Sequence, residues 1–322
     1  MSVTGVGLFS GGLDSILAQM VLRAAGVDTL AVTFVSPFFG AEAARDAAAA
    51  QGLELVVLEM GEDYLAMVKN PPRGRGSNMN PCIDCHGFMF AEARGVMRRR
   101  GADFLFSGEV LGQRPMSQNR QALNTVAKLS GCPELVLRPL SARCLRPTRV
   151  ETEGLVDREK LHDLQGRSRK PQMALAERLG VRQYPAPAGG CLLTEPGFSR
   201  RLADLWQHHP EAGPSHIELL KWGRHLRLSP AAKLVVGRRH EENQRLAKLA
   251  PAAALHLKAV DAPGPLGLYF GPAPSPELEL AAALVAGYGK SAPGSTVKVE
   301  VAGQAMLEVT AMSRRLAQPY LL

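Results

Sequence analysis

Residues 10–15 read Ser-Gly-Gly-Leu-Asp-Ser, and they decide the fold of the first half of this chain. They stand between an apolar run at residues 6–9 and an amphipathic run at residues 13–22. The first run predicts a buried strand and the second predicts a helix, so the six residues form a glycine-rich turn at the start of a helix. Unpaired backbone N–H groups and the helix dipole at such a position favour an anion such as phosphate.

Each residue type in this turn suits a phosphate ligand. Gly11 and Gly12 let the backbone approach the ligand without interference from a Cβ atom. The hydroxyls of Ser10 and Ser15 can add direct hydrogen bonds to phosphate oxygens. Asp14 is a carboxylate beside a polyanion, which is explained if Mg²⁺ lies between them. The turn therefore predicts a nucleotide phosphate site with a magnesium ion.

The next hundred residues alternate between strand-like and helix-like segments. Apolar and β-branched residues predict strands at 29–35, 53–58 and 104–106, and helical patterns cover 41–50 and 86–100. This alternation predicts an α/β fold with a doubly wound parallel sheet. Ligands of such sheets bind at the carboxyl ends of the strands, which is where the glycine-rich turn lies.

The pattern changes again from about residue 230. Strand-like runs at 233–236, 255–260, 266–270 and from residues 296 and 306 are mixed with helical patterns at 241–249 and 276–288. We therefore expect a separate, smaller α+β domain at the C-terminus.

Composition and charge narrow the class of protein. The length of 322 residues is typical of two domains, and 46% hydrophobic residues are enough for a core. A net charge of +8 and a pI near 9.4 suit a polyanionic partner. No window approaches the ~20 apolar residues of a membrane span. We expect a soluble, cytoplasmic protein with no membrane contact.

The cysteines predict a cluster. Residues 82–85, Cys-Ile-Asp-Cys, open the predicted helix, whose amino terminus would stabilise both thiolates. Cys191 is the natural third ligand, and three thiolates can hold a 4Fe-4S cluster with one iron left open. A Zn²⁺ site that adds His86 and a redox pair without metal are the alternatives. Cys132 and Cys144 are interpreted as small hydrophobic residues, although either could carry a persulfide.

Residues 10–15 lack the Walker A ending and the Gly-x-Gly-x-x-Gly spacing. The turn resembles the PP-loop of the ATP pyrophosphatase family, whose members cleave ATP between the α and β phosphates and adenylate a substrate. The resemblance implies an adenine nucleotide alpha hydrolase-like domain that uses ATP and Mg²⁺. A glycine turn that opens an ordinary helix is the other interpretation.

Further motifs resemble the catalytic domain of tRNA 4-thiouridine synthetases. They are Gly-Glu-Val-Leu-Gly-Gln at 108–113, Ser-Gln at 117–118 and Leu-Arg-Pro-Leu at 137–140. The Asn-Pro-Cys triplet at 80–82 is similar to a segment of 2-thiouridylases, and the three cysteines resemble those of cluster-dependent tRNA thiolases. The likeness implies ATP contacts by Gly108, Gln113, Ser117 and Gln118.

The C-terminal part has a resemblance of its own. Residues 236–243 and 255–264 are similar to the NFACT-R domain of ribosome-quality-control proteins, an RNA-binding module. We therefore expect a PP-loop domain at 1–183, a connecting segment with Cys191 at 184–229, and an NFACT-R-like RNA-binding domain at 230–322.

Basic residues in two places are candidate RNA contacts. Arg167, Arg169 and Lys170 could clamp phosphates of RNA or ATP, since arginine forks suit phosphate oxygens. Arg238 and Arg239 lie in the NFACT-R-like segment. A solvated basic surface is the alternative for both places. The loop at 71–81, rich in proline, glycine and arginine, is expected to be basic and mobile.

Together these features predict an ATP-dependent tRNA sulfurtransferase. With ATP on the loop and Mg²⁺ on Asp14, a nucleobase carbonyl oxygen attacks the α phosphorus, and sulfur then displaces AMP. Asp84 is the candidate for proton transfer, with helix capping as the alternative. Partners would be tRNA or another RNA and a sulfur donor protein or inorganic sulfide, and a homodimer is compatible with the sequence. An adenylating enzyme for a small molecule and a noncatalytic RNA or ribosome factor stay open.

Overall fold

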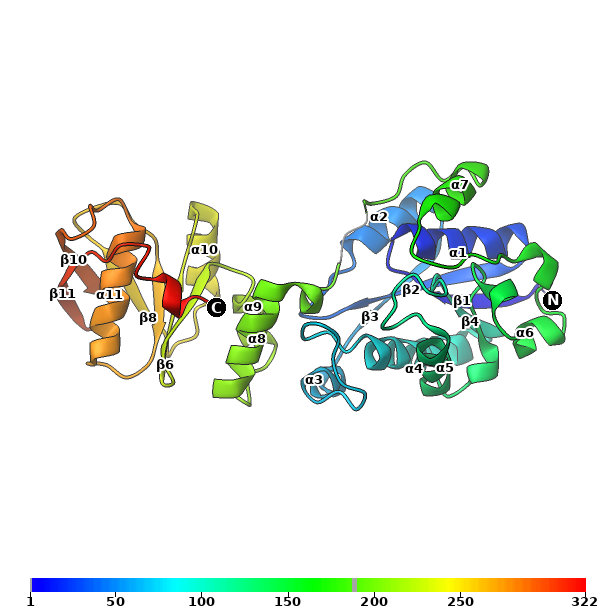
Figure 1. The fold of residues 1–322 in the computed structure, drawn as a ribbon, viewed down its shortest axis with the longest axis horizontal. Helices are drawn as coiled ribbons and strands as arrows, with labels where there is room; N and C mark the ends of the chain where they lie inside the picture. The colour runs from blue at the N-terminus through cyan, green and yellow to red at the C-terminus, as the bar shows by residue number, and fades with distance from the viewer. Residues whose placement is uncertain (1, 187–189) are drawn as a thin grey trace. The chain divides into compact units, whose positions relative to one another are not determined.

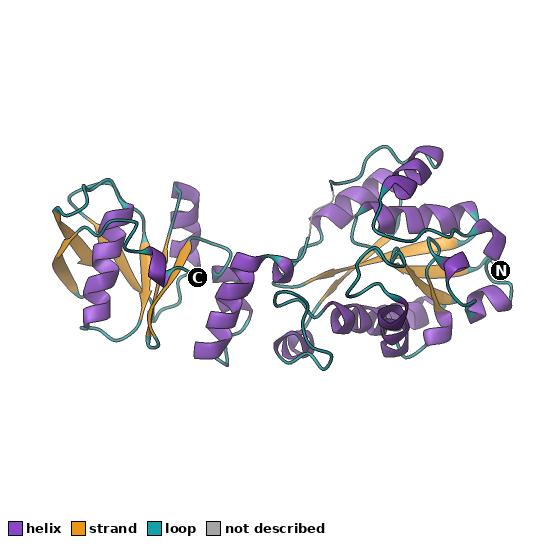
Figure 2. Ribbon diagram, in the orientation of Figure 1, coloured by secondary structure: helices purple, strands orange, loops and turns teal. Residues whose placement is uncertain are grey.

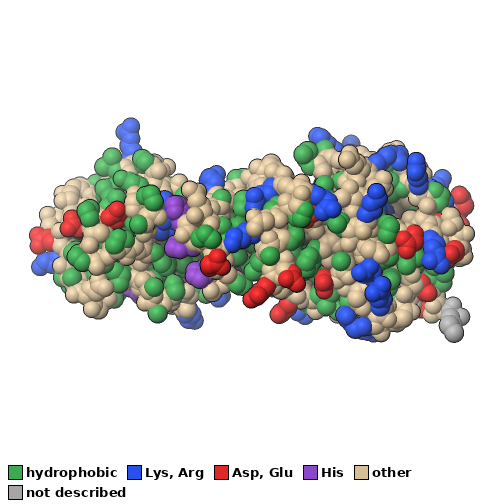
Figure 3. Space-filling model, turned by 90° about the horizontal axis from the view of Figure 1, so that it is seen from below, with side chains coloured by type: hydrophobic (Ala, Val, Ile, Leu, Met, Phe, Trp, Pro, Cys, Tyr) green, Lys and Arg blue, Asp and Glu red, His purple; other side chains and the backbone are tan. Residues whose placement is uncertain are grey.

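The computed structural model describes residues 2–186 and 190–322. The chain forms two compact units, Met1–Thr194 and Glu195–Leu322. Each unit is built around a sheet of its own, with helices packed against it (Figures 1 and 2). On the face drawn in Figure 3, lysine and arginine side chains occur on both units.

The N-terminal unit contains a parallel sheet with the strand order β3-β2-β1-β4-β5 (Figure 1). Its strands are β1 (Thr4–Leu8), β2 (Asp28–Val35), β3 (Leu55–Glu59), β4 (Phe104–Ser107) and β5 (Val136–Leu137). Val6 of the central strand β1 is fully buried and pairs with Leu30 on one side and Leu105 on the other. Burial on both faces explains why these strands are apolar without alternation. The predicted doubly wound parallel sheet is confirmed.

Helices cover both faces of this sheet (Figure 1). One face carries α1 (Leu13–Ala24), α2 (Glu42–Gln51) and α7 (Lys170–Arg178), and the other carries α3 (Glu62–Lys69), α4 (Cys82–Arg100) and α5 (Arg120–Leu129). Short elements complete the unit: η1 (Pro133–Leu135), η2 (Ala142–Cys144), α6 (Arg149–Thr152), η3 (Arg158–Lys160) and η4 (Leu192–Thr194). Leu13, Ile16 and Leu17 of α1 are almost completely buried and form the centre of the core.

The C-terminal unit is an α+β fold around an antiparallel sheet with the order β11-β10-β8-β9-β7-β6. Its strands are β6 (Arg224–Ser229), β7 (Ala232–Val236), β8 (Leu255–Ala259), β9 (Gly267–Phe270), β10 (Thr296–Val301) and β11 (Ala305–Thr310). Its helices are α8 (Pro196–His208), α9 (Pro214–Leu219), α10 (His240–Leu249), α11 (Pro276–Tyr288) and the short η5 (Gln318–Tyr320).

Residues on opposite faces of β7 belong to two different cores in this unit. Leu234 packs in the same cluster as Val285 of α11, whereas Val235 packs with Leu219 of α9 and Leu246 of α10. Side chains alternate across a strand, so one strand supplies both cores. The predicted smaller α+β unit at the C-terminus is thus confirmed.

Several boundaries differ from the sequence predictions. Helix α4 begins at Cys82, four residues before the expected start, and α3 was not predicted. The segment expected to connect two domains, residues 184–229, contains α8, α9 and β6, and the two units divide within it at Thr194. Residues 187–189 of this segment lie outside the described residues. Among the described residues, no helix has the length and apolar character needed to cross a membrane.

Candidate functional site

The glycine-rich loop joins the end of β1 to the start of α1, as the sequence predicts. Gly12 is the N-cap residue of α1 and has no side chain with which to cap it. The Ser15 hydroxyl donates to the Gly12 carbonyl (2.8 Å), and the Ser10 and Ser15 hydroxyl oxygens lie 3.3 Å apart. Two hydroxyls and the first backbone N–H groups of α1 therefore gather where an anion would be held.

Two glycines allow this loop its position. Gly11 has a φ of +76°, and a Cβ atom there would lie 2.3 Å from the carbonyl oxygen of Ala43. Gly108, directly after β4, packs on the loop from the other side: its Cβ would lie 2.4 Å from the backbone carbonyl of Asp14 and 2.6 Å from the Ser15 nitrogen. Contacts this short do not occur between real atoms, so both positions require glycine. Gly108 supports the loop whether or not it also contacts a nucleotide.

Asp14 has one satisfied and one unsatisfied carboxylate oxygen. Its Oδ2 accepts a hydrogen bond from Gln113 Nε2 (2.9 Å). Its Oδ1 is buried and has no hydrogen-bond partner among the described residues. Burial raises the pKa of Asp14, while the Gln113 hydrogen bond and the charges of Arg169 and Arg114 oppose this. A buried carboxylate oxygen without a partner is a suitable ligand for Mg²⁺.

The segments that border the loop are tied to each other through their backbones. The Gly112 N–H donates to the Gln118 carbonyl (2.7 Å), and the Gly166 N–H donates to the Leu111 carbonyl (2.7 Å). These bonds bring the segment around residue 113 together with the segment around residue 166. Arg169, which follows Gly166, is thereby placed where its charge acts on Asp14.

Three unsatisfied buried atoms lie in these bordering segments. Gln113 Oε1, Gln118 Oε1 and Arg169 Nε are buried without partners in the described part of the chain. Most buried polar atoms in folded proteins are paired, so such a group of orphans marks a place for a ligand. Ser117, also implied by the resemblance, is buried beside Gln118.

Glu109 contrasts with Asp14 because both of its carboxylate oxygens have hydrogen-bond partners. Its Oε2 accepts from Arg138 Nε (2.9 Å) and from the Ser107 hydroxyl (3.0 Å), and its Oε1 lies 2.9 Å from His86 Nδ1. Burial alone would raise the pKa of Glu109, but Arg138 and His86 together hold it at about 2. Arg138 also donates to the Leu123 carbonyl.

Sequence analysis missed this pairing, although Glu109 and Arg138 both stand in the quoted motifs. The available signal was one acidic and one basic residue, each next to an apolar strand. The pairing also bears on the alternative zinc site, because His86 would have to leave Glu109 to bind a metal.

The structure brings the three predicted cysteines into one region. Cys82 and Cys85 lie in the first turn of α4. The segment of Cys191 is held by two hydrogen bonds, from Leu192 N to the Phe38 carbonyl (3.0 Å) and from Asn78 Nδ2 to the Thr194 carbonyl (2.9 Å). Cys82 and Cys191 each raise the pKa of Cys85, so the three thiols lie within electrostatic reach of one another.

The thiols are the donor type that an iron–sulfur cluster or zinc requires. Within residues 2–186 and 190–322, however, no three His, Cys, Asp or Glu side chains are arranged to hold a single metal ion. The three thiols thus have the chemistry of metal ligands, but their arrangement among the described residues is not that of a ligand shell.

The expectation that the helix terminus stabilises both thiolates is wrong for Cys85. Burial raises the pKa of Cys85 to about 12, although a contact with the Tyr64 hydroxyl (3.3 Å) partly offsets this. Burial likewise raises the pKa of Cys191 to about 11. Burial therefore disfavours the thiolate form of both sulfurs, and a bound cation would oppose this effect.

Asp84 is buried and bound to the loop before it. Its carboxylate accepts from the backbone N–H of Arg73 (3.0 Å) and from Arg73 Nη1 (2.7 Å). The N-cap of α4 is Pro81, so Asp84 does not cap this helix. Its role in proton transfer stays a prediction.

The loop at 71–81, expected to be mobile, is attached at several points instead. Arg75 Nη2 donates to the Lys69 carbonyl (2.7 Å), and Asn80 Nδ2 donates to Cys82 Sγ (3.2 Å). Although exposed, Arg73 and Arg75 thus anchor the chain through these hydrogen bonds. Their hydrogen bonds explain why a sequence rich in proline and glycine is ordered here.

The charge of Arg114 acts both on Asp14 in the glycine-rich loop and on Cys191. It lowers the pKa of Asp14 and also that of Cys191, against the larger effect of burial in both cases. The side chain is exposed, and it follows Gln113, whose amide contacts Asp14. Sequence analysis did not select Arg114, although it adjoins a motif residue.

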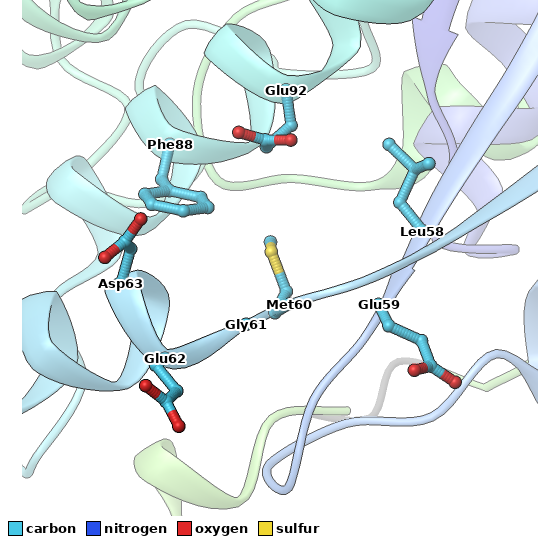
Figure 4. Close-up of a pocket in the computed structure, with 8 residues that line it drawn as sticks. All are labelled: Leu58, Glu59, Met60, Gly61, Glu62, Asp63, Phe88 and Glu92. Atoms are coloured by element: carbon cyan, nitrogen blue, oxygen red, sulfur yellow. The ribbon is translucent and has the colours of Figure 1, made fainter.

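A separate hollow of about 390 Å³ lies where β3 ends and α3 begins (Figure 4). Carboxylates of Glu59, Glu62, Asp63 and Glu92 surround it, and Phe88 and Met60 form its apolar part (Figure 4). Negative charges of this density repel phosphate, so this hollow is not a nucleotide site.

The predicted RNA contacts lie in both units. Arg167 and Lys170 are exposed beside the half-buried Arg169 in the N-terminal unit. In the C-terminal unit, Arg238 is paired with Glu242 (Nη2 to Oε1, 2.8 Å), whereas Arg239 is exposed at the start of α10.

Comparisons with known proteins match the two units separately. The family described as the NFACT protein RNA binding domain matches residues 223–320, which confirms that resemblance. A search of the curated proteins gives no match.

Among solved structures, the chain is similar to a 4-thiouridine synthetase–RNA complex with bound ATP (22% identity, 56% of this chain and 52% of that chain, TM-score 0.36). It is also similar to a predicted subunit of tRNA methyltransferase from Methanocaldococcus jannaschii (15% identity, 55% and 76%, TM-score 0.34). A third is the NH3-dependent NAD synthetase from Campylobacter jejuni (14% identity, 69% and 83%, TM-score 0.34). All three are distant likenesses.

Proposed function

We propose that this protein is an ATP-dependent RNA-modifying enzyme that adenylates a nucleobase carbonyl oxygen and replaces that oxygen with sulfur. The observation that carries the proposal is the glycine-rich loop with its buried Asp14, whose Oδ1 has no hydrogen-bond partner among the described residues. An activation site at this loop and a sulfur site at Cys82, Cys85 and Cys191 would belong to the same unit.

ATP would lie on the loop with its pyrophosphate against Ser10, Gly11, Gly12 and Ser15. The unpartnered Oδ1 of Asp14 would be a ligand of Mg²⁺. The amide oxygens of Gln113 and Gln118 and the Nε of Arg169 would find partners in the nucleotide or its waters. Binding would thus satisfy buried atoms that are otherwise costly to leave unpaired.

The reaction proceeds in two substitutions. The carbonyl oxygen of the base attacks the α phosphorus, the bond to the β phosphate breaks, and diphosphate leaves. A hydrosulfide sulfur then attacks the base carbon, AMP departs with the oxygen, and loss of the sulfur proton gives the thiocarbonyl. With a cysteine persulfide as donor, the outer sulfur attacks the carbon and AMP leaves, and a second cysteine thiolate then cleaves the S–S bond, which gives the thiocarbonyl and a disulfide. Arg114 and Arg169 would stabilise the charge that develops on the phosphate in both steps.

Cys82, Cys85 and Cys191 would hold a 4Fe-4S cluster, or Zn²⁺ in the alternative. A bound cluster would supply an open iron that binds sulfide. Hydrogen bonds of the chain itself position the residues around the thiols: Tyr64 contacts Cys85, Asn80 contacts Cys82, and Arg73 holds Asp84. For Asp84 to accept a proton, its contacts with Arg73 must first open.

RNA is the proposed substrate class because the matched family is described as an RNA binding domain. Arg238 and Arg239 of that segment, with Arg167, Arg169 and Lys170 of the N-terminal unit, are the proposed contacts. The ATP-using domain would end near residue 183, and the RNA-binding domain would begin near residue 223, where the family match begins.

The test combines three measurements on anaerobically purified protein. Iron, sulfide and zinc assays identify the metal group. Protein, ATP, Mg²⁺, sulfide and bulk tRNA are then incubated, and AMP, diphosphate and thiolated nucleosides are quantified, the last by mass spectrometry. We expect all three products in equal amounts.

Cys191→Ser should abolish the thionucleoside, whereas Cys144→Ser should leave it unchanged. Cys144 is the matched control because its Sγ donates to the Asp163 carbonyl outside the thiol region. AMP and diphosphate formed without RNA would favour an adenylating enzyme for a small molecule. Absence of both products with every acceptor would overturn the enzymatic proposal.

A further inference from the structure

The C-terminal unit contains a buried carboxylate that binds two cations. Asp204 of α8 accepts a two-pronged pair of hydrogen bonds from Arg227 of β6, Nε to Oδ1 and Nη2 to Oδ2, both 2.8 Å. Lys233 of β7 donates its Nζ to Oδ2 of the same carboxylate, also at 2.8 Å. One helix and two strands are joined at this centre.

The charges at this centre do not cancel. The Asp204, Arg227 and Lys233 side chains are 8%, 15% and 7% exposed, so two cations share one anion away from bulk water. Burial lowers the pKa of Lys233, and only the bond to Asp204 opposes this appreciably. Buried charges are normally paired, because an uncompensated one costs several kcal/mol. An external anion would supply the missing negative charge.

Arg201 adds a further cation on the same face of α8, since it lies three residues before Asp204. Its Nε is buried and has no hydrogen-bond partner among the described residues. Its Nη2 is 3.8 Å from Glu195 Oε2, which is long for an ion pair, and Glu195 is half exposed. The Arg201 side chain is 19% exposed and its guanidinium lies 5.9 Å from the centre of the Phe198 ring, so an incoming ligand would reach it from its exposed side.

A hollow of about 320 Å³ lies beside the centre. It is lined by His208, His209 and His216 with residues 210–212. His208 Nε2 is 3.7 Å from Asp204 Oδ1, and the charges of Arg227 and Lys233 act on His209. Figure 3 shows histidine side chains gathered on the surface of this unit. The hollow thus borders the centre at His208, while Arg201, Arg227 and Lys233 lie outside its lining.

We infer that α8, β6 and β7 form a phosphate-binding centre for the RNA backbone, in which Arg201 contacts the phosphate and Arg227 and Lys233 supply positive field. This inference rests on the proposed RNA substrate but not on the sulfur chemistry. It extends the RNA-binding surface to α8, which precedes the residues that match the RNA-binding family.

The test is RNA binding by the full-length protein without ATP or sulfide. Fluorescent tRNA is titrated at several KCl concentrations, and the dissociation constant is followed by anisotropy. Arg201→Gln should weaken binding about tenfold, the value expected for one charge-assisted hydrogen bond. The slope of log affinity against log salt should fall by about one.

Arg200→Gln is the matched control, because Arg200 is the exposed neighbour on the same helix and carries the same charge. We expect a change of less than twofold for this variant. Equal effects of the two variants, or none for Arg201→Gln, would overturn the inference.

Arg201→Lys gives a second measure that does not depend on how well the Gln variant folds. It keeps the charge but loses the planar guanidinium, and we expect binding weaker than that of wild type. Wild-type affinity for Arg201→Lys would contradict a specific contact. Inorganic phosphate is then titrated against the protein–RNA complex, as a competitor for the phosphate of the RNA backbone. Competition that occurs only in proteins with an intact Arg201 supports the centre, and equal competition in Arg201→Gln opposes it.

The result separates the two proposals. RNA binding that depends on Arg201 in a protein that forms no AMP would sustain the phosphate centre and reject the enzyme. RNA binding that is independent of Arg201 in a protein that thiolates tRNA would do the reverse.

Discussion

Asp14 and Glu109 lie at the same edge of the same parallel sheet, and they differ in how their charge is met. Glu109 is fully buried and accepts from Arg138, Ser107 and His86. Asp14 accepts from Gln113 with one oxygen and leaves the other without a described partner. A carboxylate with partners on both oxygens stabilises the frame, by which we mean the packed sheet and helices of this unit. A carboxylate with an unpaired oxygen is available for a ligand.

The pKa values express the same difference. Both carboxylates are penalised by burial, but Arg138 and His86 lower the pKa of Glu109 to about 2. For Asp14, the opposing contributions of Gln113, Arg169 and Arg114 are smaller than the effect of burial, and its pKa is raised. The native fold therefore gains from ionised Glu109 and loses from ionised Asp14.

Glu109→Gln should have the largest effect on stability. It leaves Arg138 buried without its partner, and we expect the free energy of unfolding to fall by about 3–5 kcal/mol. Urea denaturation followed by circular dichroism measures this. Glu92→Gln, on the exposed side of α4, should change stability by less than about 0.5 kcal/mol. Similar small losses for both variants would show that Glu109 does not hold the frame.

Asp14→Asn should have the opposite profile. We expect diphosphate release to slow by about 10²- to 10³-fold, since the proposed ligand of Mg²⁺ is lost. The free energy of unfolding should stay the same or rise, because a buried charge with a raised pKa is removed. Asp46→Asn on the exposed face of α2 is the control for the rate. A large loss of stability without a loss of rate would place Asp14 in the frame with Glu109.

The sequence predicted the class of this sheet and its loop because both depend on local patterns. An apolar strand, two glycines and an amphipathic helix follow one another between residues 6 and 22, so no distant contact is needed to identify them. The same holds for Cys82 and Cys85, whose spacing is visible in the chain. The convergence of Cys191 with them was inferred from residue type.

What the sequence did not predict depends on contacts between distant residues. Glu109 meets Arg138 across 29 positions, and Tyr64 meets Cys85 across 21. Strand β6, Arg-His-Leu-Arg-Leu-Ser, carries charged residues because Arg227 pairs with Asp204 of α8. Such pairings exist only after the elements have packed, so composition and periodicity cannot identify them.

Gly108→Ala tests whether the frame and the loop are mechanically coupled. A Cβ atom 2.4 Å from the Asp14 carbonyl must displace the loop, and we expect a loss of about 1–3 kcal/mol in unfolding free energy together with weaker ATP binding. Denaturation and nucleotide titration measure the two effects.

Gly61→Ala is the matched control for this substitution. A Cβ atom at Gly61 meets nothing within 4 Å, and its φ of −81° suits alanine. If Gly108→Ala binds ATP as tightly as Gly61→Ala, the residue that follows β4 does not determine the position of the loop. The frame and the ATP site would then be independent of each other at this point.

Tyr64→Phe has the smallest expected effect. It tests whether Cys85 Sγ is satisfied by a protein partner, as Glu109 is, or lacks one, as Asp14 Oδ1 does. The substitution keeps the ring contacts with Phe38, Phe39 and Phe88 but removes the hydroxyl that lies 3.3 Å from Cys85 Sγ. We expect unfolding free energy to fall by about 1 kcal/mol, the typical net value of one hydrogen bond.

Alkylation of Cys85 in metal-free protein should slow about fivefold, because the thiolate loses a donor. Mass spectrometry measures that rate, with Cys144 in the same protein as the internal reference. Unchanged alkylation would mean that the Tyr64 hydroxyl does not influence Cys85 Sγ. This sulfur would then resemble Asp14 Oδ1, which has no partner among the described residues, and only a ligand could satisfy it.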